Sequence, residues 1–271
     1  MRVLVCLALT ATLAACTVAD PAPTGSSTPS AAVKQPVAVY YALTTPEGLG
    51  PRLVREFHRV QEPTDSVVGQ VRAAASQMLS HNALDPDYAN LWPNGAKLLN
   101  VSIAGNTATV DIGGATANNV GAQAAQIAVQ QLVWTVTAVP NIDSVKILLD
   151  GAPATELWGH VDLSKPLKRA SALDTLAPVW LISPQHGDRV GREVTLHIAG
   201  IAFEATVHYQ VRFGTQVVKE GFVTLDKGAP QQGEAKQTVT LEPGDYVIAT
   251  FLVSSEDAEK EHLDDHSVTV G

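Results

Sequence analysis

The chain has 271 residues, of which 45% are hydrophobic and 17% charged, and its formal net charge is -9. This length suits one large domain or two modest ones, and the acidic balance excludes the basic surface that nucleic-acid binding requires. The only two cysteines, Cys6 and Cys16, lie near the start, so the body of the chain has no disulfide, thiol nucleophile or cysteine metal site.

Residues 1–15 have the pattern of a secretory signal peptide. Arg2 supplies the positive start, and the apolar stretch that follows is shorter than the roughly 20 residues needed to span a bilayer. The segment 13–16, Leu-Ala-Ala-Cys, resembles the bacterial lipobox, which implies a lipid anchor on Cys16 at the outer face of the cell membrane. The alternative is an ordinary cleaved signal that happens to contain a cysteine. An acidic chain would be repelled by anionic lipid, so the lipid itself must hold it there.

Residues 16–36 begin with the lipidated cysteine and continue as a predicted disordered tether. Pro, Ser, Thr, Gly and Ala dominate this stretch, and no apolar periodicity is present. About 20 such residues have a root-mean-square reach of roughly 25 Å. The tether would therefore lift the folded part off the lipid surface.

The region 37–167 alternates between strand and helix patterns. In chain order we expect strands at 37–43 and 53–60, a helix at 66–79, a hairpin of strands at 97–104 and 107–112, a helix from about 120 to 137, and strands at 144–149 and 155–158. Thr64 or Asp65 is the expected cap of the first helix, and Asn118 or Asn119 that of the second. The order predicts an α+β fold with the helices packed on one sheet.

Several segments of this region resemble the GerMN domain, a domain of sporulation and spore-germination lipoproteins. They are Asn-Gly-Ala-Lys-Leu-Leu at 94–99, Asn-Thr-Ala-Thr-Val-Asp at 106–111, Gln-Leu-Val-Trp-Thr at 131–135, Leu-Leu-Asp-Gly at 148–151 and the closing stretch 159–167. The resemblance implies an extracytoplasmic, non-catalytic domain similar to ring-building domains that pack side by side. Many relatives occur in bacteria that never sporulate, so it implies no sporulation role.

After a predicted linker at 168–177, the region 178–271 shows only strand patterns. We expect seven strands, at 179–183, 193–199, 204–213, 216–225, 235–241, 245–254 and 263–270, which predict a β-sandwich. The segments 202–207, 219–224 and 227–230 resemble the immunoglobulin-like domain of bacterial spore germination. The change of pattern predicts two independently folding domains.

No motif in the chain indicates catalysis or a cofactor. Nucleophile-elbow, zinc-protease, phosphate-loop and dinucleotide motifs are all missing from the sequence, so we expect no enzyme, no cofactor and no catalytic or metal residue. The acidic run 256–266 could hold a divalent ion, but its spacing does not match a calcium loop, and a solvated loop is the favoured interpretation. Glu204 and Glu220 could form an acid–base pair, although a structural role is favoured.

The remaining candidates are aromatic or imidazole side chains. Trp134 and Trp158 are expected in the core, whereas Trp92 and Trp180 could be surface anchors at an interface. His160 is expected to form hydrogen bonds within a loop rather than to bind a ligand.

These observations predict a non-catalytic envelope scaffold or protein-interaction module. Its expected partners are envelope proteins or a second copy, and a cell-wall polymer is the further candidate; nucleic acid is not expected. The contact surfaces would be open strand edges, for which 37–42 and 179–183 are the candidates. A solute-, glycan- or peptidoglycan-binding lipoprotein and an envelope hydrolase remain as alternatives; the first needs a pocket and the second a nucleophile with its base.

Overall fold

The computed structural model describes residues 36–44, 50–61, 64–116 and 118–271, which all belong to one compact unit, Lys34–Gly271. The predicted signal peptide, Cys16 and the tether up to residue 35 lie outside the described residues. No helix in the described part is long and apolar enough to cross a membrane.

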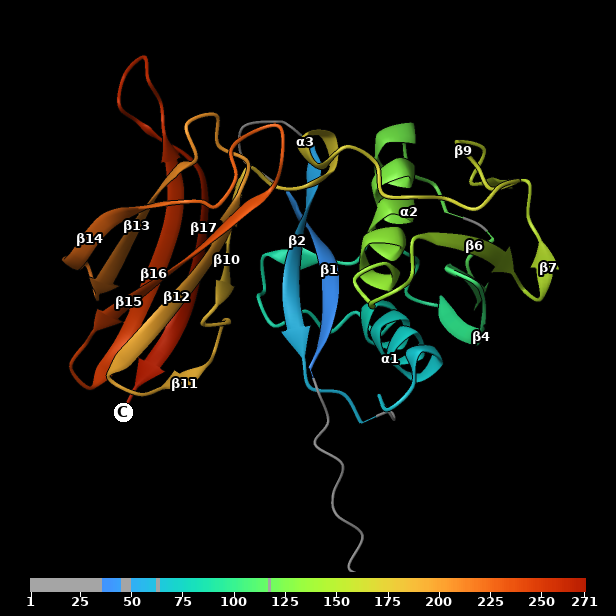
Figure 1. Cartoon of the computed structure of the whole chain (residues 1–271), viewed down its shortest axis with the longest axis horizontal. Coiled ribbons are helices and arrows are strands. Elements are labelled where there is room, and N and C mark those ends of the chain that lie inside the picture. Colours follow the sequence, from blue (N-terminus) through green and yellow to red (C-terminus); the bar gives the residue numbers. More distant parts are fainter. Residues whose placement is uncertain (1–35, 45–49, 62–63, 117) are drawn as a thin grey trace, which may run out of the picture. The chain divides into compact units, whose positions relative to one another are not determined.

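The first region contains the expected long elements in the expected order (Figure 1). They are β1 (Val37–Thr44), β2 (Pro51–His58), α1 (Val67–Leu79), β3 (Tyr88–Ala89), β4 (Lys97–Ala104), β5 (Thr107–Gly113), α2 (Ala122–Val136) and β6 (Ser144–Leu149), followed by the two-residue strands β7 (Ala152–Pro153), β8 (Glu156–Leu157) and β9 (Val161–Asp162). The mixed α/β class of this region is therefore confirmed.

Two sheets, rather than the single expected one, flank the helices of this region. One has the strand order β2-β1-β3, and the other has the order β4-β5-β6-β7. Helix α1 packs against both β1 and β4, and α2 packs against β1, β2 and β6 (Figure 1). The helices therefore lie between the sheets, which explains why Ala73, Ala74 and Ala75 of α1 are all fully buried.

Both helix caps differ from the expected ones. Ser66 caps α1, because its side-chain oxygen accepts a hydrogen bond from the Gly69 N–H at 3.1 Å. Helix α2 starts after Gly121, which offers no side-chain cap, while the Asn118 amide donates to the Leu91 carbonyl at 3.4 Å. Residues that favour helix caps stand next to one another before each helix. The sequence alone therefore did not show which residue would form the cap.

The second region is a sandwich of two sheets, as expected for an immunoglobulin-like fold. Its strands are β10 (Val179–Ser183), β11 (Arg189–Val190), β12 (Glu193–Gly200), β13 (Thr206–Phe213), β14 (Gln216–Thr224), β15 (Gly233–Thr240), β16 (Gly244–Val253) and β17 (Lys260–Val270). One sheet has the order β10-β12-β15 and the other has the order β11-β17-β16-β13-β14.

Strand β10 is buried on both of its faces. Val179 and Leu181 belong to the apolar core inside the sandwich. Trp180 and Ile182 point the other way and belong to the apolar core of the first region, together with Ala199 and Ile201. The first region therefore shares its core with the outward face of β10, whereas the inside of the sandwich forms a separate core, since alternate side chains of a strand face opposite sides.

The predicted linker 168–177 includes packed structure. Helix α3 (Ala172–Thr175) lies within it, and Leu176 and Ala177 after the helix are buried. The Ala177 N–H donates to the Leu53 carbonyl of β2 at 2.9 Å. The boundaries of the two domains, and their independent folding, stay predictions.

The two strands expected to offer contact surfaces are largely buried. Strand β1 lies between β2 and β3 and pairs with β2 along its whole length. Strand β10 ends its sheet, but its side chains are buried between the two cores. The expectation that 37–42 and 179–183 form contact surfaces is therefore wrong. Strand β14, by contrast, ends the five-stranded sheet and is largely exposed.

Candidate functional site

A buried polar joint connects the two regions at the C-terminal end of β2. The Gln185 side chain accepts a hydrogen bond from the Phe57 N–H at 2.5 Å and donates one to the Phe57 carbonyl at 2.7 Å. A single amide thus satisfies both backbone groups of one residue on the outer edge of the first sheet. This pairing blocks the β2 edge, which a second chain could otherwise extend.

Glu56 is the centre of the joint on the side of the first region. Its carboxylate accepts hydrogen bonds from the backbone N–H groups of Leu84 at 3.0 Å and Asp85 at 2.9 Å. The His58 ring lies 2.7 Å from the same carboxylate. Glu56 is only 2% exposed, and these contacts supply the partners that a buried carboxylate requires.

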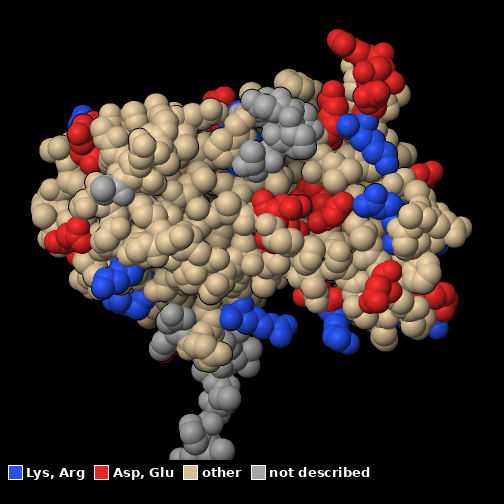
Figure 2. Space-filling view, turned by 180° about the vertical axis from the view of Figure 1, so that it is seen from behind, with Lys and Arg blue, Asp and Glu red and all other residues tan. Residues whose placement is uncertain are grey.

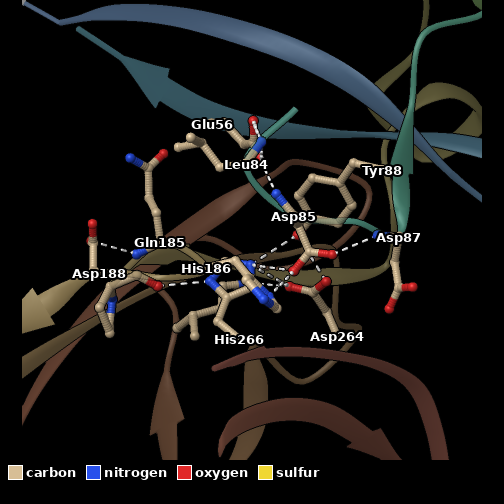
Figure 3. A network of polar contacts seen from close by, with 12 residues as sticks. Glu56, Leu84, Asp85, Asp87, Tyr88, Gln185, His186, Asp188, Asp264 and His266 are labelled. Atoms are coloured by element: carbon tan, nitrogen blue, oxygen red, sulfur yellow. Dashed lines mark hydrogen bonds and ion pairs between the residues drawn. The ribbon is translucent and has the colours of Figure 1, made fainter. Parts of the chain in front are cut away.

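Asp85 and Tyr88 lie in the segment that follows α1, and their side chains contact the second region (Figure 3). Asp85 lies 3.1 Å from Nδ1 of His186 and 3.6 Å from Nε2 of His266. The Tyr88 hydroxyl donates to Asp264 at 2.8 Å and lies 3.2 Å from Nε2 of His266. Two carboxylates, two imidazoles and a phenol from three separated chain segments therefore form one connected network.

Two backbone contacts fix the β17 side of the network. The Leu181 N–H donates to Asp264 at 2.7 Å, and Nδ1 of His266 lies 2.7 Å from the Pro184 carbonyl. A carbonyl oxygen can only accept, so Nδ1 of His266 carries a proton in this contact. Asp264 is thereby held against β10 and His266 against the residue that follows this strand.

Burial changes the acidity of the acidic groups in this network. It raises the pKa of Asp264 to about 6, although His266 and the Leu181 N–H act in the opposite direction. Burial also raises the pKa of Asp85, and it raises the pKa of Tyr88 well above its ordinary value with the neighbouring Asp264 adding to the effect. Removing water from a charged form disfavours it, which accounts for all three directions.

The joint combines residue types that occur in catalytic sites, but most of its side chains are buried. Asp264, His266 and Tyr88 are 4%, 1% and 6% exposed, and neither of the two grooves described below is lined by any of them. Its contacts all lie within the chain. The arrangement therefore links the two regions through largely buried polar contacts.

A second polar contact joins β2 to the other sheet of the sandwich. Arg55 pairs with Glu234 at 2.7 Å, and His197 contacts the second oxygen of the same carboxylate at 2.7 Å. The hydrogen bond from His197, together with the nearby Arg55 charge, lowers the pKa of Glu234 to about 2. Glu234 is about one third exposed, so solvent screens this contact more than it screens the buried joint.

Two grooves lie on the surface of the described part of the chain. The larger has a volume of about 960 Å³ and lies where the start of β2, the α3 segment and the loops before β13 and after β16 meet. Arg52, Leu173, Phe203, His208 and Glu261 are among its lining residues. The other, of about 750 Å³, is a shallow depression lined by Trp158 and by polar residues that include Asn118 and Asn119.

The acidic run 256–266 divides into two structurally different parts. Residues 256–259 form the projecting tip between β16 and β17, where Figure 2 shows acidic side chains gathered. Asp264 and His266 instead lie in β17 and are buried, so the expectation of one solvated loop is wrong for them. Within the described residues, no group of three or more His, Cys, Asp or Glu side chains is placed to hold a metal ion.

The predicted carboxylate pair takes two unrelated places. Glu204 lines the larger groove, whereas Glu220 lies on β14 and accepts a weak hydrogen bond from Gln210 at 3.4 Å. Both side chains are exposed. This placement favours the structural interpretation over an acid–base pair.

The tryptophans are partly as expected. Trp134 is buried and Trp158 is packed against the core. Trp92 and Trp180 are buried as well, at 2% and 0% exposed, so the expectation that they anchor a surface is wrong. His160 contacts the Val120 carbonyl at 3.1 Å, as expected of a residue that forms hydrogen bonds in a loop.

Both regions match known protein families. Residues 38–155 match the family described as sporulation and spore germination, and residues 178–259 match the immunoglobulin-like domain of bacterial spore germination. Neither description names an enzymatic activity. A search of curated proteins finds no significant match.

Solved structures with similar chains are distant. A candidate lipoprotein from Clostridium perfringens is 22% identical, with a TM-score of 0.37, over 49% of this chain and 86% of that one. The tandem GerMN domains of the sporulation protein GerM from Bacillus subtilis are 17% identical, with a TM-score of 0.38, over 52% of this chain and 46% of that one. Fibronectin(III)-like modules of CbhA from Clostridium thermocellum are 20% identical, with a TM-score of 0.24, over 34% of this chain and 93% of that one.

Proposed function

We propose that this chain, in which a sporulation and spore germination domain is followed by an immunoglobulin-like domain of bacterial spore germination, is a non-catalytic module that binds other proteins of the cell envelope. A lipid on Cys16 holds it at the outer face of the membrane, and the tether that follows gives it reach. The buried joint keeps the two domains in one arrangement, so that they present a single surface to a partner.

Strand β14 carries this proposal. It ends the five-stranded sheet and exposes Val217, Val218 and Phe222, which are 41%, 39% and 64% accessible. Exposed apolar edge strands are usually avoided, because they pair with other chains. A partner strand could add to this edge through backbone hydrogen bonds, which require no special side-chain motif. Lys219 and Glu220 on the same strand limit indiscriminate pairing.

A photo-cross-linking side chain at Val218 in living cells tests the proposal. We expect it to capture specific envelope proteins or a second copy of the chain. The matched control is Thr195, which is also exposed but lies on β12, the central strand of its sheet, and has no free edge. Equal or absent capture at both positions, together with tight binding of a solute or turnover of a substrate by the purified protein, would refute the scaffold function.

The lipid anchor has its own test. Replacing Cys16 by serine removes the thiol that would carry the lipid, so we expect the protein to move from the membrane fraction to the soluble fraction on cell fractionation. Replacing Cys6 by serine is the matched control, because Cys6 lies inside the predicted signal peptide and should not affect retention. Retention of the Cys16→Ser protein with membranes in high salt would contradict the anchor.

A further inference from the structure

The larger groove is a second surface, next to the β14 edge, that has the features of a binding site. Its volume of about 960 Å³ lies at the upper end of the range of ligand pockets. Arg52 and Leu173 line it on one side, and Phe203, Glu204 and Val253 line it on the other. Both regions must therefore be held in place for the groove to exist.

Three of the apolar side chains that line the groove are exposed. Phe203 is 84% accessible, Leu173 is 44% accessible and Val253 is 39% accessible. Ile201 and Leu176 are buried at the same groove. Single exposed apolar side chains are common, but three in one concave surface indicate an interaction site.

The polar rim of the groove is predominantly negative. Glu204, Glu256 and Glu261 contribute three carboxylates. The one arginine that lines the groove, Arg52, directs its guanidinium to the Asp174 carbonyl at 2.7 Å. Lys260 directly precedes Glu261 in β17 but does not line the groove; its ammonium sits over the Phe251 ring at 4.3 Å and donates to Gln210 at 3.0 Å.

We propose that this groove binds an extended peptide segment of a partner protein in which lysine or arginine alternates with apolar residues. The apolar side chains of such a segment would cover Phe203, Leu173 and Val253, and its cations would meet the three carboxylates of the rim. An anionic lipid headgroup would be repelled by the same carboxylates, and complementary charge favours a cationic segment.

The groove adjoins the β14 surface, and the proposal rests on the proposed protein-binding function. His208 lines the groove, and its ring lies 6.2 Å from the Phe222 ring of β14. Phe203 precedes β13, the strand that pairs with β14. A partner that adds a strand to β14 could therefore extend its chain into the groove.

Fluorescence anisotropy with two synthetic peptides tests the groove directly. The probe is a labelled decapeptide in which lysine alternates with leucine, and the comparison peptide has glutamate in place of lysine. The whole chain, kept free of lipid by Cys16→Ser, should bind the lysine peptide and not the glutamate peptide. Phe203→Ala should weaken binding of the lysine peptide about tenfold. The double change Glu256→Gln and Glu261→Gln should weaken this binding as well and make it less dependent on salt concentration.

Matched controls separate the groove from the rest of the surface. Phe213 is 51% accessible at the opposite end of β13, and Glu193 is exposed at the start of β12. Phe213→Ala and Glu193→Gln should leave binding unchanged. Equal binding of both peptides, or binding unaffected by Phe203→Ala and by the double change, would overturn the groove proposal. In that case, capture at Val218 in cells would still support the proposed function. Binding of the lysine peptide without capture at Val218 would contradict only the role of the β14 edge as a contact surface.

Discussion

Replacing Trp180 by alanine is expected to lower the free energy of unfolding by about 3–5 kcal/mol, the range for deletion of a large buried aromatic side chain. Trp180 is fully buried and lies on β10, which belongs to the sandwich, yet its side chain is part of the core of the first region. The cavity left by alanine would open between the regions, where neither sheet can close it alone. Urea denaturation followed by the fluorescence of the other tryptophans measures the change.

Two variants make this prediction specific. Trp180→Phe keeps a ring in the space and removes an indole N–H that has no hydrogen-bond partner among the described residues, so its cost should be much smaller. Phe203→Ala removes an aromatic ring that is 84% accessible and should change stability by less than about 0.5 kcal/mol. A cost for Trp180→Ala as small as that of Phe203→Ala would show that the two regions do not share a core.

Replacing Asp264 by asparagine is expected to change how stability depends on pH. The pKa of Asp264 is about 6 in the folded protein, against an ordinary value of 3.8. The folded state therefore holds this proton more tightly than the unfolded state does. The contribution of Asp264 to the free energy of unfolding accordingly increases as the pH falls from about 7 through 6. It is complete below about pH 4 and amounts to at most about 3 kcal/mol. Asparagine has no proton to bind and removes this contribution.

The measurement is the difference in unfolding free energy between the two proteins at several pH values from 7 to 4. Taking a difference cancels the titrating groups that do not interact with Asp264, among them Glu234, whose lowered pKa acts in the opposite direction. Asp85 acts in the same direction as Asp264 and interacts with it. Asp265→Asn is the matched control, because Asp265 is adjacent but pairs with Arg212 at 3.2 Å on the exposed face of β17. A constant difference for Asp264→Asn across this range would contradict a buried, proton-holding carboxyl.

Local patterns in the sequence were sufficient for most of the secondary structure. The Gly-Asn turn at 105–106 and the alternation on both sides of it predicted the β4–β5 hairpin, and the observed pairing of Ala104 with Thr107 confirms it. Seven of the sandwich strands follow from apolar runs separated by turn residues. These features depend on neighbours in the chain, which is why a single sequence reveals them.

The joint was missed although part of its signal was present in the sequence. Val268 and Val270 face the sandwich core, and counting back in steps of two places Asp264 and His266 on the same inward face. Instead, the high density of acids in 256–266 suggested a solvated loop. In a strand, every second side chain faces inward, and this alternation can continue through polar residues. Such a continuation distinguishes buried acidic residues from a stretch of acidic residues on the surface.

The partners in the joint could not be predicted from local pattern. Tyr88 lies 176 positions before Asp264, and Gln185 lies 128 positions after Phe57. Trp92 and Trp180 were misplaced for the same reason, since their burial depends on the packing of distant segments. Three-dimensional packing, and not periodicity, decides which polar residues meet.

The shared core at β10 also has a consequence for how the protein matures. A chain is made and emerges from its N-terminus, so the first region, which ends near residue 167, is complete in sequence before residue 180 appears. Its core, however, includes Trp180, Ile182, Ala199 and Ile201. A nascent chain that ends before residue 201 leaves the apolar surface they cover exposed to water. The first region therefore cannot finish burying its core until the start of the sandwich has emerged. The two regions reach their final packing together, although their order in the sequence suggests that the first packs before the second.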